Sequence, residues 1–314
     1  MGMFVRALDN ACLRKHNISM NKLSRERKAQ VVAALCEGVS VSATARLTKT
    51  NKRTVLRILA EVGKACIEYQ DKALRNLKCR RLQADETWSF VAMKQKTAKR
   101  RGKTGFGVGD VWTWLAIDAD TKLIPSWYLS ETRDGGAAYE FISDLQTRLA
   151  HRVQLTTDGH KAYLDAVDST FGIDIDYAML VKLYGKDPND AEHRYSPAVC
   201  IGTERTVISG DPDPEHISTS YVERSNLSIR MHTRRFTRLT NAFSKKLENH
   251  QYAVALFFMF YNFARIHQTL RVTPAMEAKV LLPDGTEKAV ADHVWTVEEI
   301  VALAPEPEAP VVLR

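Results

Sequence analysis

The stretch Gln83-Ala84-Asp85-Glu86-Thr87-Trp88-Ser89-Phe90 decides the fold, because two adjacent carboxylates interrupt a run that otherwise has the composition of a buried strand. A carboxylate inside an apolar strand costs several kcal/mol unless it is paired or binds a metal. We therefore expect this pair to mark a functional site. Neighbouring strand residues point to opposite faces of a sheet, so only one of the two should share a site with carboxylates from other elements.

Segments after this stretch alternate between strand and helix patterns. Runs rich in aromatic and β-branched residues predict strands at 82–93, 111–117, 123–129, 153–157 and 175–183. Amphipathic runs predict helices at 134–150 and 160–171. Strand-helix-strand units make the first, fourth and fifth strands parallel neighbours. The predicted fold class is α/β: a ribonuclease-H-like mixed five-stranded sheet flanked by helices, with an irregular insertion at 184–215 that holds a short β element at 206–208.

Residues 20–78 predict a small all-α domain ahead of the sheet. Ser24 is a good N-cap for a first helix that Gly38 ends, and a second helix follows at 40–49. A third helix, from Thr50 or Asn51, has apolar residues on one face and Lys52, Arg53 and Arg57 on the other. Three short helices with a turn that contains glycine are typical of a helix-turn-helix, whose last helix enters the DNA major groove.

The distribution of charge favours DNA binding by these helices. The chain carries a net charge of +8, but residues 1–81 hold 18 basic and 6 acidic side chains, a net of +12. Excess positive charge attracts polyanions. Lys52, Arg53 and Arg57 are then the predicted contacts to bases and phosphates. The alternative is a small helical bundle with a solvated basic face.

Composition also bounds the remaining segments. We expect a basic arm at 1–19, the helix-turn-helix domain with a linker helix at 20–78, the catalytic domain at 79–274 and an acidic, solvated tail at 275–314, where the net charge is −5. The five cysteines lack metal or redox spacing and indicate reduced, mostly buried thiols. No signal peptide is visible, and the most apolar segment, 253–264, is shorter than the roughly 20 residues that span a bilayer. A cytoplasmic, nucleoid-associated protein is expected.

Three carboxylates on separate elements are candidates for one metal site. Asp85 lies inside the first strand, Asp158 ends the fourth strand, and Glu223 lies on a later helix. Ligands of open α/β sheets gather at the carboxyl ends of parallel strands, and hard oxygen ligands suit Mg²⁺. Two such ions can activate the attacking hydroxyl and neutralise the leaving oxygen in phosphodiester chemistry. The aspartates at 118, 120, 174 and 176 lie at turns or strand edges, where we expect water to satisfy them.

Basic residues near these carboxylates suggest a nucleic-acid track. Arg230 follows Glu223 by two helical turns, so both lie on one helix face, and it could bind a phosphate beside the scissile bond or belong to an intrahelical charge pattern. Two clusters of basic residues lie near by in the sequence. Lys99, Arg100 and Arg101 lie in a basic loop at 94–103, which could also be merely solvated, and Arg234 and Arg235 follow the Glu223 helix. Clusters of this kind bind phosphates without reading sequence.

Four motifs, in this order, resemble the DDE transposases of bacterial insertion sequences, most closely those of the type named insertion sequence one. The resemblance covers roughly residues 20–275. The motifs are Asp85-Glu-Thr-Trp-Ser-Phe90, Thr156-Thr-Asp-Gly-His-Lys-Ala-Tyr163, Ser220-Tyr-Val-Glu-Arg-Ser-Asn226 and Tyr261-Asn-x-x-Arg265-x-His267-x-x-Leu270-x-x-Thr273-Pro274. The resemblance selects Asp85 over Glu86 as the strand ligand.

This resemblance implies the activity and its partners. Asp85, Asp158 and Glu223 would bind two Mg²⁺ ions, for which Mn²⁺ can substitute, and Arg230 would stand where the family often has a basic residue. It also implies binding of terminal inverted repeats and of target DNA, and a homo-oligomer that bridges two DNA ends. Some relatives carry a zinc-binding cysteine module that has no counterpart here, so end recognition would rest on the helix-turn-helix. Two alternatives remain: a DNA-binding regulator with an inactive nuclease-like domain, and a ribonuclease-H-type nuclease that cleaves without joining.

Overall fold

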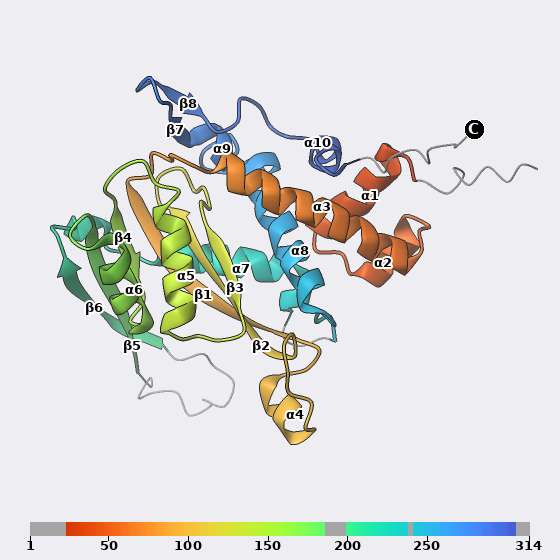
Figure 1. The fold of residues 1–314 in the computed structure, drawn as a ribbon, viewed down its shortest axis with the longest axis horizontal. Coiled ribbons are helices and arrows are strands. Elements are labelled where there is room, and N and C mark those ends of the chain that lie inside the picture. The colour runs from red at the N-terminus through yellow and green to blue at the C-terminus, as the bar shows by residue number, and fades with distance from the viewer. Residues whose placement is uncertain (1–22, 186–198, 238–240, 306–314) are drawn as a thin grey trace, which may run out of the picture.

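A mixed six-stranded sheet forms the centre of the molecule in a computed structural model, which describes residues 23–185, 199–237 and 241–305 (Figure 1). The strand order is β3-β2-β1-β4-β5-β6. β1, β4 and β5 are parallel neighbours, as predicted, and the other three strands pair antiparallel. The strands span Arg81–Val91 (β1), Gly109–Asp118 (β2), Trp127–Ser130 (β3), Gln154–Thr157 (β4), Asp176–Gly185 (β5) and Val199–Ser209 (β6).

The sixth strand corrects the prediction of a five-stranded sheet. The element expected at 206–208 is part of β6, which pairs with β5 at the edge of the sheet. Residues 200–209 are exposed or half-buried along their whole length. An edge strand that buries neither face has no alternation of apolar and polar residues, so its length leaves no signal in the sequence. β3 also begins later than predicted, at Trp127 rather than residue 123.

Helices cover both faces of the sheet, and alternate residues of β2 show which helices lie on each face. Trp114 and Ala116 join the core of α5 (Gly135–Gln146) and α6 (Ala162–Phe171). Leu115 and Ile117 instead pack with α7 (Ser220–His232) and α8 (Leu247–Met259). Figure 1 shows α5 on the near side of the sheet and α7 on the far side. Because side chains alternate along a strand, this division also fixes the direction of each residue of the paired β1.

Three N-terminal helices form where the sequence predicts them: α1 (Arg25–Cys36), α2 (Val41–Leu47) and α3 (Lys52–Ala73). Ser24, Ser40 and Asn51 cap them by accepting backbone N–H groups. α3 is a single helix of 22 residues, so the predicted linker is its continuation. It packs along α8, and the buried residues of α1 and α3 belong to the same hydrophobic core as the sheet.

Gly63 allows α3 and α8 to approach each other closely. A Cβ at this position would lie 2.5 Å from Cβ of Tyr252 and 2.9 Å from its Cα and carbonyl oxygen. The Gly63→Ala variant should therefore lose about 1–3 kcal/mol of stability through overpacking, although alanine favours a helix by about 1 kcal/mol. Urea unfolding measures this. Gly135→Ala, where the added Cβ meets nothing within 4 Å, is the matched control, and equal stability of both variants would contradict the packing.

The segment predicted as a solvated acidic tail is folded up to residue 305, which is a correction. It forms α9 (Pro274–Glu277), β7 (Lys279–Leu281), β8 (Glu287–Ala289) and α10 (Val297–Ala302). Ile300 and Val301 are buried, and α10 packs against α1. The acidic side chains lie outward, and a Thr296/Glu299 capping box starts α10. The prediction of a solvated tail followed the net charge of the segment and overlooked its few, widely spaced apolar residues. The arm at 1–19 and residues 306–314 lie outside the described residues.

No helix among the described residues is long and apolar enough to cross a membrane.

Candidate active site

Asp85 and Asp158 meet at the carboxyl edge of the parallel strands. The register of β1 and β4 pairs Ala84 with Thr157, so the two aspartates are the next residue of each strand. β4 ends there, whereas β1 continues and pairs Asp85 with Leu115 of β2. Because β4 ends at this point, a space remains beside β1, and the Asp85 side chain lines that space. The predicted convergence of these two carboxylates therefore follows directly from strand register.

α7 lies across β1, and the spacing of side chains along the helix matches the spacing along the strand. Four residues of a helix advance about 6 Å and two residues of a strand about 6.7 Å, so every fourth residue of α7 meets every second residue of β1. The hydrogen bonds pair Gln83 with the backbone N–H of Val222, Asp85 with the Asn226 amide and Thr87 with the Arg230 guanidinium, at 3.2, 2.8 and 2.8 Å respectively. This match places side chains of α7 over β1 and beside Asp85.

The first turn of α7 is capped by a side chain of β1 rather than by the residue that precedes the helix. Its N-cap residue, Thr219, makes no capping hydrogen bond, and Gln83 Oε1 accepts the N–H groups of both Tyr221 and Val222. The Thr219 hydroxyl instead donates to Glu223 Oε1 at 2.7 Å. The cap fixes the first turn of α7 to β1, and with it the height of Glu223 above the sheet.

One cavity of about 680 Å³ collects all four predicted catalytic side chains. Asp85, Asp158, Glu223 and Arg230 all line it. The Glu223 carboxylate also accepts a hydrogen bond from Lys182 of β5. The Arg230 guanidinium donates a hydrogen bond to the Thr87 hydroxyl of β1, at 2.8 Å. The geometry thus brings together side chains that are up to 145 positions apart in the sequence.

Glu86, which the resemblance passes over in favour of Asp85, also lines this cavity. Its side chain does point to the opposite face, where it accepts a hydrogen bond from the Tyr163 hydroxyl at 2.9 Å and one from Arg133. However, oxygens of Asp85, Glu86 and Asp158 lie within 4.8 Å of one another, and Glu223 is not in this group. Where β4 ends, side chains from both faces of β1 reach the same edge. The adjacent acidic pair was the available signal.

Arg133 joins two of these carboxylates. Its guanidinium pairs with Glu86 and lies 3.5 Å from an oxygen of Asp158, while its Cζ carbon lies 5.1 Å from the centre of the Trp112 ring. Cation–π contact with an aromatic ring helps to hold an arginine side chain in place. Arg133 belongs to no motif and precedes α5 in a loop, so nothing in the sequence marked it.

The carboxylates that gather in this cavity raise the pKa values of two of their own members. Burial, and then the negative charges of Glu86 and Asp158, raise the pKa of Asp85 to about 7. Burial and Asp158 also raise the pKa of Glu86, against the opposing effect of Arg133. Proteins that gather more carboxylates than cations at one place can complete the site with a hard divalent cation. The all-oxygen donor set and the raised pKa both fit such an ion.

The raised pKa of Asp85 predicts pH-dependent metal binding. A cation binds the ionised carboxylate, so protons compete with it as the pH falls through about 7. We expect Mn²⁺ to bind about tenfold more weakly near pH 6 than near pH 8, as measured by calorimetric titration. Affinity that stays constant over this range would show that Asp85 is already ionised or does not bind the ion.

The aspartates that were excluded from the site lie outside its cavity, but one expectation about them is wrong. Asp118 is 1% exposed, and burial raises its pKa. It is satisfied by the Thr121 hydroxyl and by the backbone N–H groups of its own turn, at 2.6 to 3.4 Å, rather than by water. Asp176 pairs with Arg152. These residues are structural.

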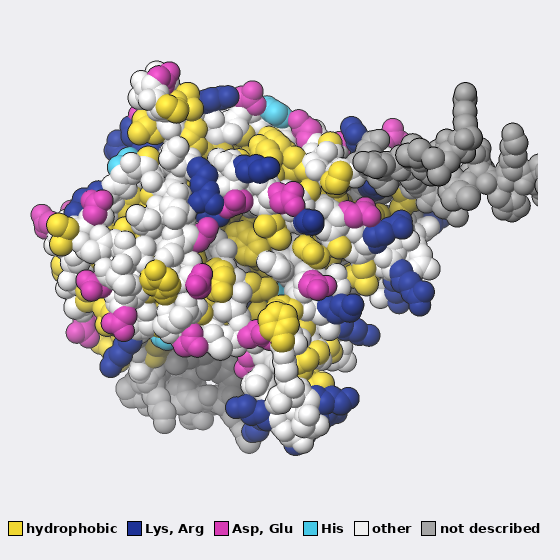
Figure 2. All heavy atoms as spheres, viewed as in Figure 1, with side chains coloured by type: hydrophobic (Ala, Val, Ile, Leu, Met, Phe, Trp, Pro, Cys, Tyr) yellow, Lys and Arg dark blue, Asp and Glu magenta, His cyan; other side chains and the backbone are white. Residues whose placement is uncertain are grey.

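The predicted DNA-binding residues fall into three places. Lys52, Arg53 and Arg57 are exposed on α3, where Arg57 lies 3.7 Å from Glu61. The exposed residues Lys99–Arg101 lie on or directly after α4 (Gln95–Arg100), which projects from the body (Figure 1). Figure 2 shows dark blue side chains around α4 and around the N-terminal helices. After α7, Arg234 is exposed, but Arg235 turns inward and donates to Ser244 at 2.8 Å.

Comparisons with known proteins identify part of the chain. Residues 107–195 match a protein-family model described as a DDE domain, a span that contains Asp158 but neither Asp85 nor Glu223. No curated protein matches the chain.

Among solved structures, the chain is similar to piggyBac transposase in a synaptic complex with hairpin DNA, with a TM-score of 0.42 and 11% identity over 92% of this chain and 74% of that chain. It is also similar to a chain of the simian T-cell lymphotropic virus intasome in complex with the PP2A regulatory subunit B56 gamma, with a TM-score of 0.35 and 14% identity over 80% of this chain and 73% of that chain. Both TM-scores are below 0.5.

Proposed function

We propose that this chain is a DDE transposase of the insertion-sequence-one type, which binds the terminal inverted repeats of its element and catalyses metal-dependent DNA cleavage and strand transfer. The observation that carries the proposal is the convergence of Asp85, Asp158, Glu223 and Arg230 on one cavity from β1, the end of β4 and α7. The match of residues 107–195 to a DDE domain supports it. The sheet, with parallel β1, β4 and β5 beside antiparallel β2 and β3, is consistent with a ribonuclease-H-like domain.

Asp85, Asp158 and Glu223 are the proposed ligands of two Mg²⁺ ions, for which Mn²⁺ can substitute. Bound ions would supply a nucleophile at neutral pH and neutralise charge on the leaving oxygen. Glu223 is half-exposed and turns toward Lys182 and Thr219, so it must rotate toward Asp85 to bind an ion. The Lys182 ammonium can balance the charge of Glu223 until then.

The remaining side chains position the DNA and the ligands. Asn226 donates to Asp85 Oδ2 and leaves Oδ1 to accept the Glu86 backbone N–H at 2.8 Å, which fixes the carboxylate plane. Thr87 holds Arg230 from below, so the guanidinium can bind a phosphate beside the scissile bond. The helices α1 to α3 are the proposed helix-turn-helix, and the protein is expected to act as a homo-oligomer on two DNA ends.

The proposal is tested with a supercoiled plasmid that carries the element ends, incubated with Mg²⁺ or with EDTA. A transposase nicks the ends and joins them to target DNA only when Mg²⁺ is present. A DNA-binding regulator would bind the ends without either reaction, and a plain nuclease would cleave without joining. Binding or cleavage alone therefore contradicts the proposed function.

A further inference from the structure

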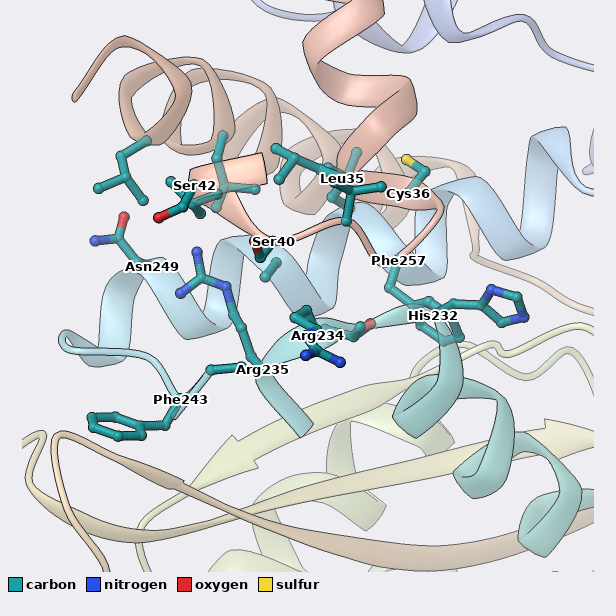
Figure 3. A pocket seen from close by; sticks show the side chains of 18 of the residues that line it. Leu35, Cys36, Ser40, Ser42, His232, Arg234, Arg235, Phe243, Asn249 and Phe257 are labelled. Carbon is teal, nitrogen blue, oxygen red and sulfur yellow. The ribbon is translucent and has the colours of Figure 1, made fainter. Parts of the chain in front are cut away.

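A second cavity lies away from the carboxylates, between the N-terminal helices and the segment after α7 (Figure 3). Its volume is about 370 Å³, and it shares no lining residue with the carboxylate cavity. Apolar side chains such as Leu35, Leu59 and Leu256 form much of its wall. The α1–α2 turn closes it on one side, because a Cβ at Gly38 would lie 3.0 Å from the His232 carbonyl oxygen at the end of α7.

The charges around this cavity are all of one sign. Its described lining includes Lys52, Arg234, Arg235 and Lys245 but no aspartate or glutamate. None of these four makes an ion pair with another described residue. Lys52, Arg234 and Lys245 are exposed and form its rim, whereas Arg235 is half-buried and its Nη2 atom is fully buried. A concave surface lined by cations alone attracts an anion.

A buried chain of hydrogen bonds holds one side of the Arg235 guanidinium in place. The Ser89 hydroxyl donates to the Val111 carbonyl oxygen and so accepts from Nε2 of His250 at 3.1 Å. Nδ1 of His250 is then unprotonated and accepts from Ser244, at 2.9 Å. Ser244 in turn accepts from Nη1 of Arg235 at 2.8 Å. Each proton in the chain is assigned, and burial, with Arg235 nearby, lowers the pKa of His250 to about 3, so the imidazole stays neutral.

The other side of the Arg235 guanidinium meets no hydrogen-bond partner among the residues that the structure describes. Nη2 is buried and makes no hydrogen bond with a described residue. Burial lowers the pKa of Arg235 to about 10, so the group is still charged at neutral pH. Figure 3 shows the side chain extending toward α2, with its guanidinium between Asn249 and Ser40. A buried charge without a counterion is strongly unfavourable, and an anion in the cavity would remove that cost.

We propose that this cavity is a phosphate-binding site in which Arg235 takes one backbone phosphate of bound DNA. The source of the phosphate rests on the proposed function, while the anion chemistry rests on the cavity alone. A guanidinium fixed on one side offers its free edge to a phosphate as a pair of parallel donors. The cations of the rim continue the positive surface outward, as a polyanion requires, and Lys52 begins α3, the proposed recognition helix. Arg234 and Arg235, predicted as equal members of one track, thus have different roles.

The test compares Arg235→Met with Arg234→Met, a neighbouring and exposed control. Binding of a short duplex that carries the element end is measured by fluorescence anisotropy in EDTA at several salt concentrations. Arg235→Met should weaken binding by about tenfold or more, because a charged hydrogen-bonded pair is lost, and Arg234→Met should weaken it less. Arg235→Lys keeps the charge and should recover part of the affinity. Each variant that loses one phosphate contact should also reduce, by about one, the magnitude of the slope of the logarithm of the binding constant against the logarithm of the salt concentration.

Stability separates this role from a structural one. The melting temperature of free Arg235→Met should be equal to or above that of the wild type, since an unpaired buried charge is removed. Sodium phosphate should raise the melting temperature of the wild type, compared with sodium chloride of equal ionic strength, but not that of Arg235→Met. A lower melting temperature with unchanged DNA affinity would overturn the proposal. So would stabilisation by free phosphate without any loss of DNA affinity in Arg235→Met, because the site would then serve a free anion.

These measurements use no Mg²⁺ and no strand joining. Loss of the proposed function through inactivity of the carboxylate site would therefore leave their outcome unchanged.

Discussion

Replacing Asp85 with asparagine should reduce metal-dependent cleavage and joining by more than about a hundredfold, while the melting temperature of the metal-free protein should rise. Loss of residues that only support a metal ligand costs about 10- to 100-fold, so loss of a ligand should cost more. Asp85 accepts hydrogen bonds from both α7 and its own strand, and its carboxylate lies with Glu86 and Asp158 at the edge of the sheet. The change removes one charge from the centre of this cluster.

The gain in stability follows from the direction of the pKa shift. Burial and the neighbouring charges raise the pKa of Asp85 from 3.8 to about 7 in the folded protein. A carboxyl that binds its proton more tightly when folded destabilises the fold wherever the unfolded chain is ionised. This penalty appears as the pH rises above about 4 and is complete above about 7. The Asp85→Asn variant should therefore gain most near pH 8 and almost nothing near pH 4.

The site can accept asparagine without losing a hydrogen bond. The new amide oxygen can accept the Glu86 backbone N–H, and its NH₂ group then faces Asn226. Oδ1 of Asn226 is buried without a hydrogen-bond partner among the described residues, so rotation of this amide would let it accept from the new NH₂ group. Melting in EDTA at the two pH values, beside the plasmid assay, checks both effects. An active variant, or one that melts below the wild type near pH 8, would contradict this description of Asp85.

Replacing Asn262 with alanine should cost about 2–6 kcal/mol of unfolding free energy, the largest effect on stability that we expect. Asn262 is fully buried in a short π-helix, Phe260–Ala264, that follows α8. Its side chain accepts the backbone N–H of Ile124 at 3.0 Å and donates to the Ile124 carbonyl oxygen at 2.9 Å. Alanine would leave two buried backbone groups unpaired, each at about 1–3 kcal/mol.

Urea unfolding of Asn262→Ala beside Gln268→Ala measures this effect. Gln268 is exposed a few residues further along the same motif, so its loss should change stability by no more than about 0.5 kcal/mol. Binding of the element ends by the folded fraction should survive in both variants. If Asn262→Ala is as stable as Gln268→Ala, water must satisfy Ile124, and the asparagine is not a structural clamp.

Asn262 and a proline together account for one difference between the predicted and observed strands. Residues 123–126 have the composition of a strand, and two of their carbonyl oxygens do accept N–H groups of β2. However, Pro125 has no N–H to donate, and the Asn262 side chain, 138 positions away, binds both backbone groups of Ile124, so β3 begins only at Trp127. Composition reports strand propensity, whereas the partner of each backbone group depends on distant residues.

The sequence predicted best which side chains lie together where local pattern and register coincide. The convergence of Asp85 and Asp158 was predictable because each interrupts or ends an apolar strand, and parallel strands bring such residues together. Lys182 and Arg133 were missed, since each reaches its carboxylate partner only through the packing of separate elements. The folded segment at 275–304 was missed for a related reason. Its few apolar residues are spread among charged ones and gain a core by packing against α1, α3 and the π-helix that follows α8.

The identity of the third carboxylate is the central claim that remains to be tested, because the structure groups Glu86, and not Glu223, with Asp85 and Asp158. Glu86 already has Tyr163 and Arg133 as partners and is buried, whereas Glu223 is half-exposed in the cavity, where Lys182 and Thr219 donate to it. The most direct measurement is Mg²⁺-dependent joining of a pre-cut element end by Glu223→Gln and by Glu86→Gln. We predict that Glu223→Gln abolishes joining and that Glu86→Gln retains much of it. Joining that survives in Glu223→Gln but is lost in Glu86→Gln would contradict the proposed triad and make Glu86 the third ligand.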